Sequence, residues 1–255
     1  MKIISFNVNG LRHIFKSLEY HDVFQNFVVC EDPDAIFLQE TRCPRDVPLP
    51  KWFGDMFPFN GICAATKKGY SGVGYFSKTK PVCVVNELVD ETDVSEGRSQ
   101  LVDFGAFQIV NLYVPNSKPD LARLAFRAEI WEPAVIAAIQ EVELPNCILI
   151  GDLNVVPCDV DAYKKLPKNM HCATPAEKGA FGNLCTSLGF VDAFRELHPT
   201  KREYSWFSNF ANSREKNNGL RIDHVLCKPG FIRSITYRKD IIGSDHVPVV
   251  IEFDV

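Results

Sequence analysis

Asp245 and His246 are neighbours in residues 243–248, a short segment between a turn and the last expected strand. If this segment is extended, adjacent side chains point to opposite sides. Asp245 could then hold a metal ion while His246 faces a substrate. A Gly-Ser-Asp turn is also common loop chemistry, and a solvated polar turn explains this motif alone equally well. The functional interpretation therefore depends on partners elsewhere in the chain.

Asp152 and Asn154 form a second motif, just after the apolar residues 147–150. Gly151 permits a sharp turn there, and in an extended segment a spacing of two puts both polar side chains on one face. A carboxylate that accepts a proton, beside an amide that orients a water molecule, suits hydrolysis. The alternative for this motif alone is an Asx turn that caps the strand.

Asp223 lies in residues 217–224, where a turn is followed by strand-like residues. A carboxylate in this position could orient and charge-stabilise the imidazole of His246. The alternative is that His246 is a satisfied surface histidine, which is the usual case for a single histidine. The presence of Asp245 and Asp223 favours the functional interpretation.

Glu40, Asp245 and Asn7 are candidate metal ligands that offer only oxygen atoms. Glu40 follows an apolar run, where a carboxylate is costly unless it is solvated or paired with a cation. Oxygen ligands favour Mg²⁺ or Mn²⁺ over zinc. A hard cation with an incomplete protein cage completes its shell with water and phosphate oxygens. The implied chemistry is metal-assisted attack of water on a phosphate ester, with His246 countering charge on the phosphate.

The elements that must position these side chains are mostly short strands. At 255 residues, 46% hydrophobic and 24% charged, the sequence predicts one large soluble domain over residues 1–255. Many short strands with a few interspersed helices predict two packed sheets flanked by helices. Most candidate site residues fall where strand-like runs end, and one edge of such a sandwich is a natural place to gather a site. Helices are expected at 11–28, at 121–139 with a kink at Pro133, and at 177–188 after a capping box that begins at Thr174. Strands are expected at 2–8, 35–39, 61–65, 72–77, 82–85, 101–104, 107–114, 147–150, 221–227 and 247–253.

Charge is unevenly distributed along the chain, although the net charge is only −4. Residues 81–110 hold six acidic residues and a single basic one, Arg98, whereas residues 195–239 hold ten Lys or Arg against four acidic residues. This asymmetry could present a basic face to a polyanion, or it could be a chance fluctuation on solvated surfaces.

Nine scattered cysteines without a CxxC motif argue against a disulfide framework and favour a reducing compartment. No apolar run approaches membrane-spanning length, and strand-like residues begin at Lys2, which leaves no room for a targeting segment. We therefore expect a soluble intracellular protein with no membrane partner. The sequence does not distinguish the nucleus from the cytoplasm.

Seven motifs occur in the order that is typical of one family, at residues 5–12, 38–41, 70–73, 113–116, 151–154, 219–223 and 243–246. Over essentially its whole length the chain resembles the exonuclease III family of abasic-site DNA endonucleases, within the endonuclease/exonuclease/phosphatase superfamily. The resemblance implies a four-layered α/β sandwich of two packed mixed β-sheets flanked by helices. It also implies Mg²⁺-dependent cleavage of duplex DNA 5′ to abasic sites, which leaves a 3′-hydroxyl, together with 3′–5′ exonuclease activity and trimming of 3′ ends. Mn²⁺ is an alternative ion, and we expect a monomer.

The same resemblance implies a role for each catalytic candidate. Asp152 corresponds to the residue that activates the water and Asn154 to the one that orients it. His246, paired with Asp223, corresponds to the group that stabilises the phosphate, and Tyr113 contacts that phosphate through its phenol. The principal metal ligand is Glu40, with Asp245 and Asn7 close by. The formal base and the number of metal ions stay open.

The residues implied to contact DNA fall into two groups. Trp206, Leu220 and Ile222 correspond to a small apolar pocket that accepts a sugar without its base and excludes normal nucleotides by size. Without the resemblance, plain core packing would be the preferred explanation for Trp206 and Ile222. The second group corresponds to residues that line the DNA groove, mainly through phosphates, and consists of Arg12, Tyr70, Arg98, Asn116 and Arg123.

Some residues depart from the pattern of relatives. Leu220 replaces a Trp found in many members and Asn9 an Asp found in some, and residues 158–173 align poorly. The rival functions within the superfamily are an inositol phosphatase and an RNA deadenylase, but residues 7–12 and 219–223 belong to the DNA-cleaving branch. A catalytically weak DNA-binding homologue would require a broken site, whereas every catalytic position is filled here.

Overall fold

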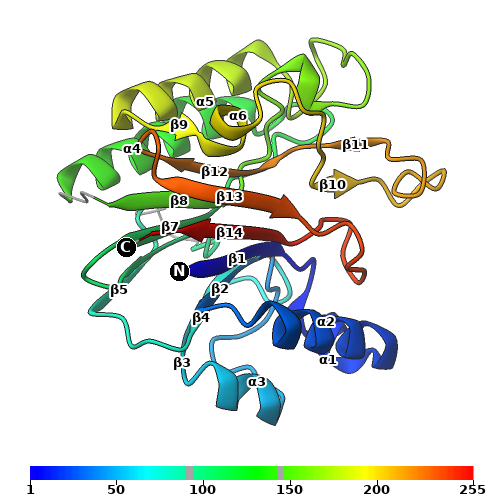
Figure 1. Ribbon diagram of the computed structural model, residues 1–255. Helices are drawn as coiled ribbons and strands as arrows, with labels where there is room; N and C mark the ends of the chain where they lie inside the picture. Colours follow the sequence, from blue (N-terminus) through cyan, green and yellow to red (C-terminus); the bar gives the residue numbers. More distant parts are fainter. Residues whose placement is uncertain (90–94, 143–145, 255) are drawn as a thin grey trace.

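Two six-stranded mixed sheets pack face to face in the computed structural model, which describes residues 1–89, 95–142 and 146–254 (Figure 1). Helices cover the outer face of each sheet, so the molecule has four layers. The expected α/β sandwich of two packed mixed sheets flanked by helices is therefore confirmed.

The first sheet joins both ends of the chain and has the order β13-β14-β1-β2-β4-β3. The pair β1–β2 is parallel, and the other neighbours are antiparallel. Its strands are β13 (Ile232–Tyr237), β14 (Val249–Phe253), β1 (Lys2–Asn7), β2 (Ala35–Gln39), β4 (Val73–Ser77) and β3 (Phe59–Cys63). The outer face of this sheet is covered by α1 (Leu11–Lys16), α2 (Leu18–Glu31) and α3 (Lys51–Met56).

The second sheet repeats this plan with the order β5-β6-β7-β8-β12-β9, in which β7–β8 is the parallel pair. Its strands are β5 (Cys83–Asn86), β6 (Ser99–Asp103), β7 (Gln108–Tyr113), β8 (Cys147–Asp152), β12 (Asp223–Cys227) and β9 (Val191–Asp192). A small separate ribbon pairs β10 (Trp206–Phe207) with β11 (Gly219–Leu220). The helical elements on this side are the π-helix η1 (Phe126–Trp131), α4 (Glu132–Glu141), the 3₁₀-helix η2 (Asp159–Asp161), α5 (Pro175–Leu188) and α6 (Ala193–Leu197).

The inner strands carry apolar side chains on both faces because each sheet is buried on both sides. In β8, Ile148 and Ile150 join the core between the sheets, whereas Leu149 joins the core beneath α4 and α5. In β1, Ile3 faces the opposite sheet and Ile4 faces the helices. This double burial explains why these strands read as continuous apolar runs in the sequence.

The helix predictions met three different outcomes. The helix at 177–188 is confirmed as part of α5, with the Thr174–Glu177 capping box. The single helix expected at 11–28 is wrong, because Ser17 has an extended backbone and caps a new helix. The helix expected at 121–139 corresponds to η1 followed by α4. The π-helical turn of η1 precedes Pro133, which occupies the first turn of α4, where no hydrogen bond within the helix needs its missing N–H.

Four strands, β9, β10, β11 and β13, were not predicted. Three of them have only two residues, and β13 contains the polar residues Arg233, Ser234 and Thr236 at the edge of its sheet. The other strands lie within a few residues of the predicted ranges. Their pairing places the site, since Tyr113 is in register with Asp152, and Asp152 with Asp223. The ends of β7, β8 and β12 therefore meet at one edge of the second sheet.

Candidate active site

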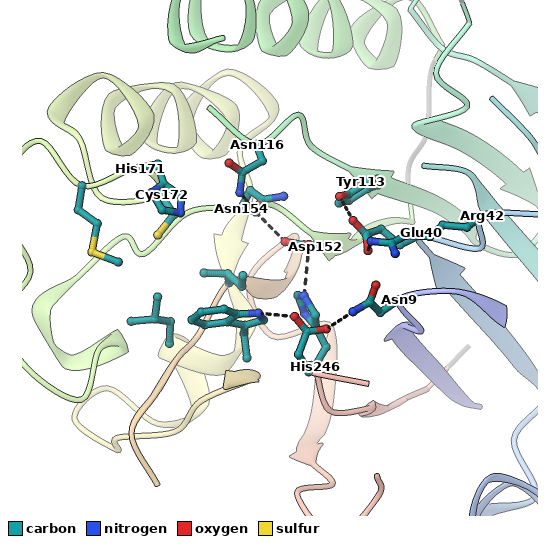
Figure 2. Close-up of a pocket in the computed structure, with 15 residues that line it drawn as sticks. Asn9, Glu40, Arg42, Tyr113, Asn116, Asp152, Asn154, His171, Cys172 and His246 are labelled. Carbon is teal, nitrogen blue, oxygen red and sulfur yellow. Dashed lines mark hydrogen bonds and ion pairs between the residues drawn. The ribbon is translucent and has the colours of Figure 1, made fainter. Parts of the chain in front are cut away.

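A cavity of about 230 Å³ opens at the edge where the two sheets present their site residues (Figure 2). Asp152 lies at its centre, between Asn154 and His246, while Glu40 and Tyr113 lie together on one side. Ten of the sequence-predicted residues line it: Glu40, Tyr113, Asn116, Asp152, Asn154, Trp206, Leu220, Ile222, Asp245 and His246. Residues from the whole length of the chain are thus brought to one site.

Asp152 ends β8 and is buried. Its Oδ2 accepts a hydrogen bond from Asn7 Nδ2 (3.0 Å), and its Oδ1 accepts one from the backbone N–H of Asn154 (2.9 Å). The second bond is an Asx turn, so the predicted alternative is present together with the candidate chemistry. Asn154 has a left-handed backbone (φ 48°), so the expected extended geometry is wrong there. Its side chain is held by Asn116 Nδ2, which donates to Asn154 Oδ1 (2.9 Å).

His246 lies between two buried carboxylates. Its Nδ1 is 2.8 Å from Asp223 Oδ2, and its Nε2 is 3.7 Å from Asp152 Oδ2. Burial disfavours the imidazolium, but the charges of Asp223 and Asp152 outweigh it and raise the pKa of His246 to about 10. Burial raises the pKa of Asp152 to about 7, against the opposing effect of His246. At neutral pH, therefore, a cationic imidazolium lies beside a carboxyl group that can accept or release a proton.

Asp245 and His246 border the same cavity, so the expected division onto opposite sides is wrong. Residues 243–245 form a bend and His246 makes an isolated β-bridge to Trp206, so the alternation of an extended strand does not apply to the pair. The two side chains nevertheless have different partners. Asn9 Nδ2 and Trp206 Nε1 each donate to Asp245, at 2.9 Å. These bonds and the charge of His246 overcome burial and hold the pKa of Asp245 below its usual range.

Glu40 follows β2 and its two oxygens have separate partners. The Tyr113 hydroxyl donates to Oε1, and Arg42 Nη2 donates to Oε2 (2.9 Å). Burial, and then the charge of Glu40, raise the pKa of the Tyr113 phenol well above its usual range. The guanidinium of Arg98 lies 4.6 Å from the centre of the Tyr113 ring. Tyr113 therefore remains a protonated hydrogen-bond donor that faces the cavity.

Residues 4–246 match the Endonuclease/Exonuclease/phosphatase family. This chain belongs to that family. Among curated relatives, it is 35% identical to a Bacillus subtilis exodeoxyribonuclease, over 98% of both proteins. It is 32% identical to the zebrafish (Danio rerio) DNA repair nuclease APEX1, over 98% of this chain and 81% of the relative.

Solved structures of other family members share the fold. An AP endonuclease from Leishmania major matches 98% of this chain and 86% of its own, with a TM-score of 0.80 and 26% identity. A Neisseria 3′ phosphatase bound to product DNA hairpin matches along 100% of both chains, with a TM-score of 0.85 and 25% identity. This chain thus shares its fold with both of these proteins.

The predicted metal ligands of this family member are not equally placed. Glu40 and Asp245 border the cavity, whereas Asn7 is buried and both of its amide atoms are used. Asn7 Nδ2 donates to Asp152, and Asn7 Oδ1 accepts the backbone N–H of Asn9 (3.0 Å). Within the described residues, no group of three acidic, His or Cys side chains converges as a ready metal cage. The donors at hand are oxygen atoms, which fit a hard cation that keeps water or phosphate in its shell.

Two of the five predicted DNA-groove residues, Arg12 and Tyr70, line a second hollow of about 330 Å³ together with Lys67 and Lys68. Asn116 instead lines the first cavity. Arg98 is buried, with only 3% of its surface exposed. Its Nη2 donates to the Tyr70 hydroxyl (2.9 Å), and Arg123 Nη1 donates to the same oxygen (3.1 Å). The expected direct phosphate contact is therefore not what this structure favours for Arg98. Its guanidinium instead contacts the hydroxyl of Tyr70 and the ring of Tyr113.

The apolar end of the cavity contains the three residues predicted for the sugar pocket, Trp206, Leu220 and Ile222. Met170 and Cys172 join the same cluster, and His171 also lines the cavity. These three come from residues 158–173, where the sequence pattern of relatives gave no guide. Asn9 and Arg42 also line the cavity. Asn9 lies within the motif at 5–12, where some relatives have Asp, but neither residue was predicted as part of the site.

Many basic residues of the 195–239 segment have partners in the fold, which leaves fewer of them for the basic face that was one of the two interpretations of this segment. Arg221 is fully buried and pairs with Asp161 (2.6 Å) and Asp192 (2.6 Å). Arg195 also pairs with Asp161. Several others have acidic partners or donate to backbone carbonyls, as Arg238, Arg233, Lys239, Arg214 and Lys228 do. Much of the local charge excess is neutralised by folding.

No helix in the described part of the chain is long and apolar enough to cross a membrane.

Proposed function

We propose that this chain is a metal-dependent DNA repair endonuclease that cleaves duplex DNA 5′ to abasic sites and leaves a 3′-hydroxyl. The observation that carries the proposal is the contact of His246 with Asp223 and Asp152 beside a small apolar pocket. We further propose that residues 1–255 form one catalytic domain that acts as a monomer. The same site would remove nucleotides or blocking groups at 3′ ends.

Asp152 is the proposed acceptor of the proton from the attacking water. Its pKa of about 7 lets it hold or release a proton near neutral pH. Asn154, fixed by Asn116, orients the water. The imidazolium of His246 counters charge on the phosphate, with Asp223 holding its Nδ1. The Tyr113 hydroxyl, which donates to Glu40 in this structure, would donate to a phosphate oxygen of bound DNA instead.

Glu40 and Asp245 are the proposed acidic ligands of Mg²⁺, with Asn7 as a third oxygen ligand and Mn²⁺ as an alternative ion. The bound ion supplies Lewis-acid neutralisation of phosphate charge. Asp245 stays ionised, because His246, Trp206 and Asn9 lower its pKa. Asn7 Oδ1 accepts the backbone N–H of Asn9 and would offer its second lone pair to the ion.

Selection of abasic sites is proposed to arise from the walls of the cavity. Trp206, Leu220 and Ile222 present apolar surface that suits a deoxyribose ring rather than a nucleotide that carries its base. Arg12, Tyr70, Asn116 and Arg123 are the proposed contacts to the flanking DNA backbone. The DNA-related names of the Bacillus and zebrafish relatives support this substrate class.

The 3′-end activity rests on a separate observation. The Neisseria relative that matches along 100% of both chains is a 3′ phosphatase bound to product DNA hairpin. We therefore propose 3′–5′ exonuclease and 3′-trimming reactions at the same site. They require the same groups but place a chain end, rather than an internal abasic nucleotide, in the cavity.

The test is incision of a duplex with one internal tetrahydrofuran lesion, compared with 3′-recessed and 3′-blocked duplexes. Asp152→Asn is expected to lower kcat by about 10³-fold and His246→Ala by about 10²-fold or more. Asp55→Asn, which changes an exposed residue of α3, is the matched control and should leave kcat unchanged. Chelator should abolish all reactions and Mg²⁺ should restore them. Wild-type rates in both site variants would contradict the roles, and activity in chelator would contradict the metal.

A further inference from the structure

Arg214 lies in the loop between β10 and β11 and reaches across to the turn that carries Asp245 and His246. Its Nη1 donates to the carbonyl of Ile241 (2.7 Å). Its Nη2 donates to the carbonyls of Ser244 (2.7 Å) and His246 (2.9 Å). In Figure 1 this loop and the loop between β13 and β14 lie at the same end of the molecule. One side chain therefore holds three backbone carbonyls of a segment that is remote in sequence.

Two of the three carbonyls that Arg214 holds belong to Ser244 and His246, the residues on either side of Asp245. The turn has little regular structure of its own, since residues 243–245 form a bend and His246 makes an isolated β-bridge to Trp206. Beyond Arg214, its backbone is tied to neighbouring segments at two points. The N–H of Phe207 donates to the carbonyl of Asp245 (2.9 Å), and the N–H of Val247 donates to that of Ser205 (2.8 Å). Loss of the guanidinium would leave the Ser244 and His246 carbonyls without this donor.

The chemistry of the contact requires an arginine. A guanidinium is planar and carries five N–H donors in a rigid fork, so it can hold several carbonyls at fixed directions. The side chain is half-buried, and its guanidinium lies 5.5 Å from the centre of the Phe207 ring, which restricts its orientation. Lysine would keep the charge but would place one ammonium group on a flexible stem.

We propose that Arg214 is a positioning residue that fixes the turn and so sets the places of the Asp245 carboxylate and the His246 imidazole. The proposal rests on the proposed function, because it assigns Arg214 to the same site. Arg214 does not line the catalytic cavity, so it acts through the two residues that do. A displacement of about 1 Å in a reacting group can cost about 100-fold in rate.

The alternative is that Arg214 merely adds positive charge that attracts DNA. Lys216 offers a matched control, because it lies in the same loop and donates to the carbonyl of Ala211 (2.9 Å), away from the catalytic turn. Arg214→Met and Lys216→Met each remove one positive charge from this loop. A role through charge alone would raise KM equally in both and leave kcat unchanged.

The experiment measures kcat and KM on the tetrahydrofuran duplex for wild type, Arg214→Met, Arg214→Lys and Lys216→Met, with the ¹H–¹⁵N signals of the His246 ring as a second readout. We expect Arg214→Met to lower kcat by about 100-fold, with a KM close to that of Lys216→Met. Arg214→Lys should give an intermediate kcat. The His246 ring signals should shift in both Arg214 variants and stay unchanged in Lys216→Met.

Wild-type kcat and unshifted His246 signals in folded Arg214 variants would overturn the proposal. If Arg214→Met does not fold, Arg214→Lys gives the same comparison with the charge retained. Failure of the proposed function is a distinct result: the wild-type enzyme itself would not incise the duplex, while the ring signals would still report whether Arg214 positions His246.

Discussion

Arg127 Nη1 donates to the backbone carbonyl of Asn154 at 2.7 Å, so a buried guanidinium from a π-helix holds the residue proposed to orient the water. Its Nη2 donates to the carbonyl of Leu153 (2.7 Å). The same side chain pairs with two buried acidic residues, Glu132 (2.7 Å) and Glu177 (3.2 Å). The loop after β8 is thus fastened to the helical layer behind it. π-Helical turns are frequently found at functional sites.

Replacement of Arg127 by Met is expected to lower the free energy of unfolding by about 3–5 kcal/mol, because it leaves Glu132 and Glu177 buried without their cation. Urea denaturation at pH 7 measures this change. Arg233→Met is the matched control, since Arg233 pairs with Asp254 on the open surface and should cost less than about 1 kcal/mol. Equal costs for the two variants would contradict the importance assigned to the buried cluster.

A second prediction concerns Gly151, which lies in β8 directly before Asp152. Its φ is 131°, and a Cβ atom there would lie 2.0 Å from the carbonyl oxygen of Leu112 on β7. Because the neighbour is backbone, Gly151→Ala must separate β7 from β8, and it is expected to cost at least about 3 kcal/mol of unfolding free energy. Gly179→Ala in α5 meets nothing within 4 Å and should stabilise by about 0.5–1 kcal/mol. Thermal unfolding of the two variants in opposite directions is the expected outcome.

The dependence of kcat on pH is the third prediction. Asp152 must be ionised to accept a proton, so kcat should rise ~tenfold per pH unit below pH 7 and level off above its pKa of about 7. His246 must stay protonated, and its pKa of about 10 keeps it so through neutral pH. The rate should fall again only when the pH approaches that value.

Asp223→Asn provides the test of this assignment. It removes the carboxylate that contributes most to raising the pKa of His246, so the falling limb of the profile should move to lower pH. Asp159→Asn changes a carboxylate of η2 outside the cavity and should leave both limbs in place. An unchanged falling limb in Asp223→Asn would mean that another group titrates there.

The sequence predicted the candidate catalytic residues better than the geometry that holds them. Asp152, Asp223 and His246 could be found because their types and motifs are distinctive, and apolar runs located the strands that bear them. Arg127 and Arg214 gave no such signal, since each acts on backbone carbonyls that only the folded chain brings within reach. The left-handed backbone of Asn154 and the bend at Asp245 also escaped prediction, because period-two reasoning applies only to extended strands.

Acid sensitivity is the fourth prediction and concerns the cluster of Arg221, Asp161 and Asp192. Although burial opposes it, the charge of Arg221 lowers the pKa of both carboxyl groups below their usual value of 3.8. A group with a lowered pKa in the folded state stabilises the fold above its unfolded pKa, and this contribution is lost as the pH falls toward the folded value. The free energy of unfolding should therefore fall steeply below about pH 4. Urea denaturation between pH 3 and pH 6 measures the slope, which should flatten in Asp192→Asn.

The last prediction tests whether the apolar wall of the cavity selects abasic nucleotides. Leu220 lines the cavity and packs with Trp206 and Ile222. Leu220→Ala widens this end, so a nucleotide that still carries its base should enter more readily. The ratio of kcat/KM for an undamaged 3′ end to that for the tetrahydrofuran duplex is expected to rise about tenfold or more. Leu166→Ala is the matched control, because Leu166 packs against the same cluster without lining the cavity, and its ratio should stay unchanged. A rise of equal size in both variants would mean that loosened packing, rather than the shape of the wall, relaxes the choice of substrate.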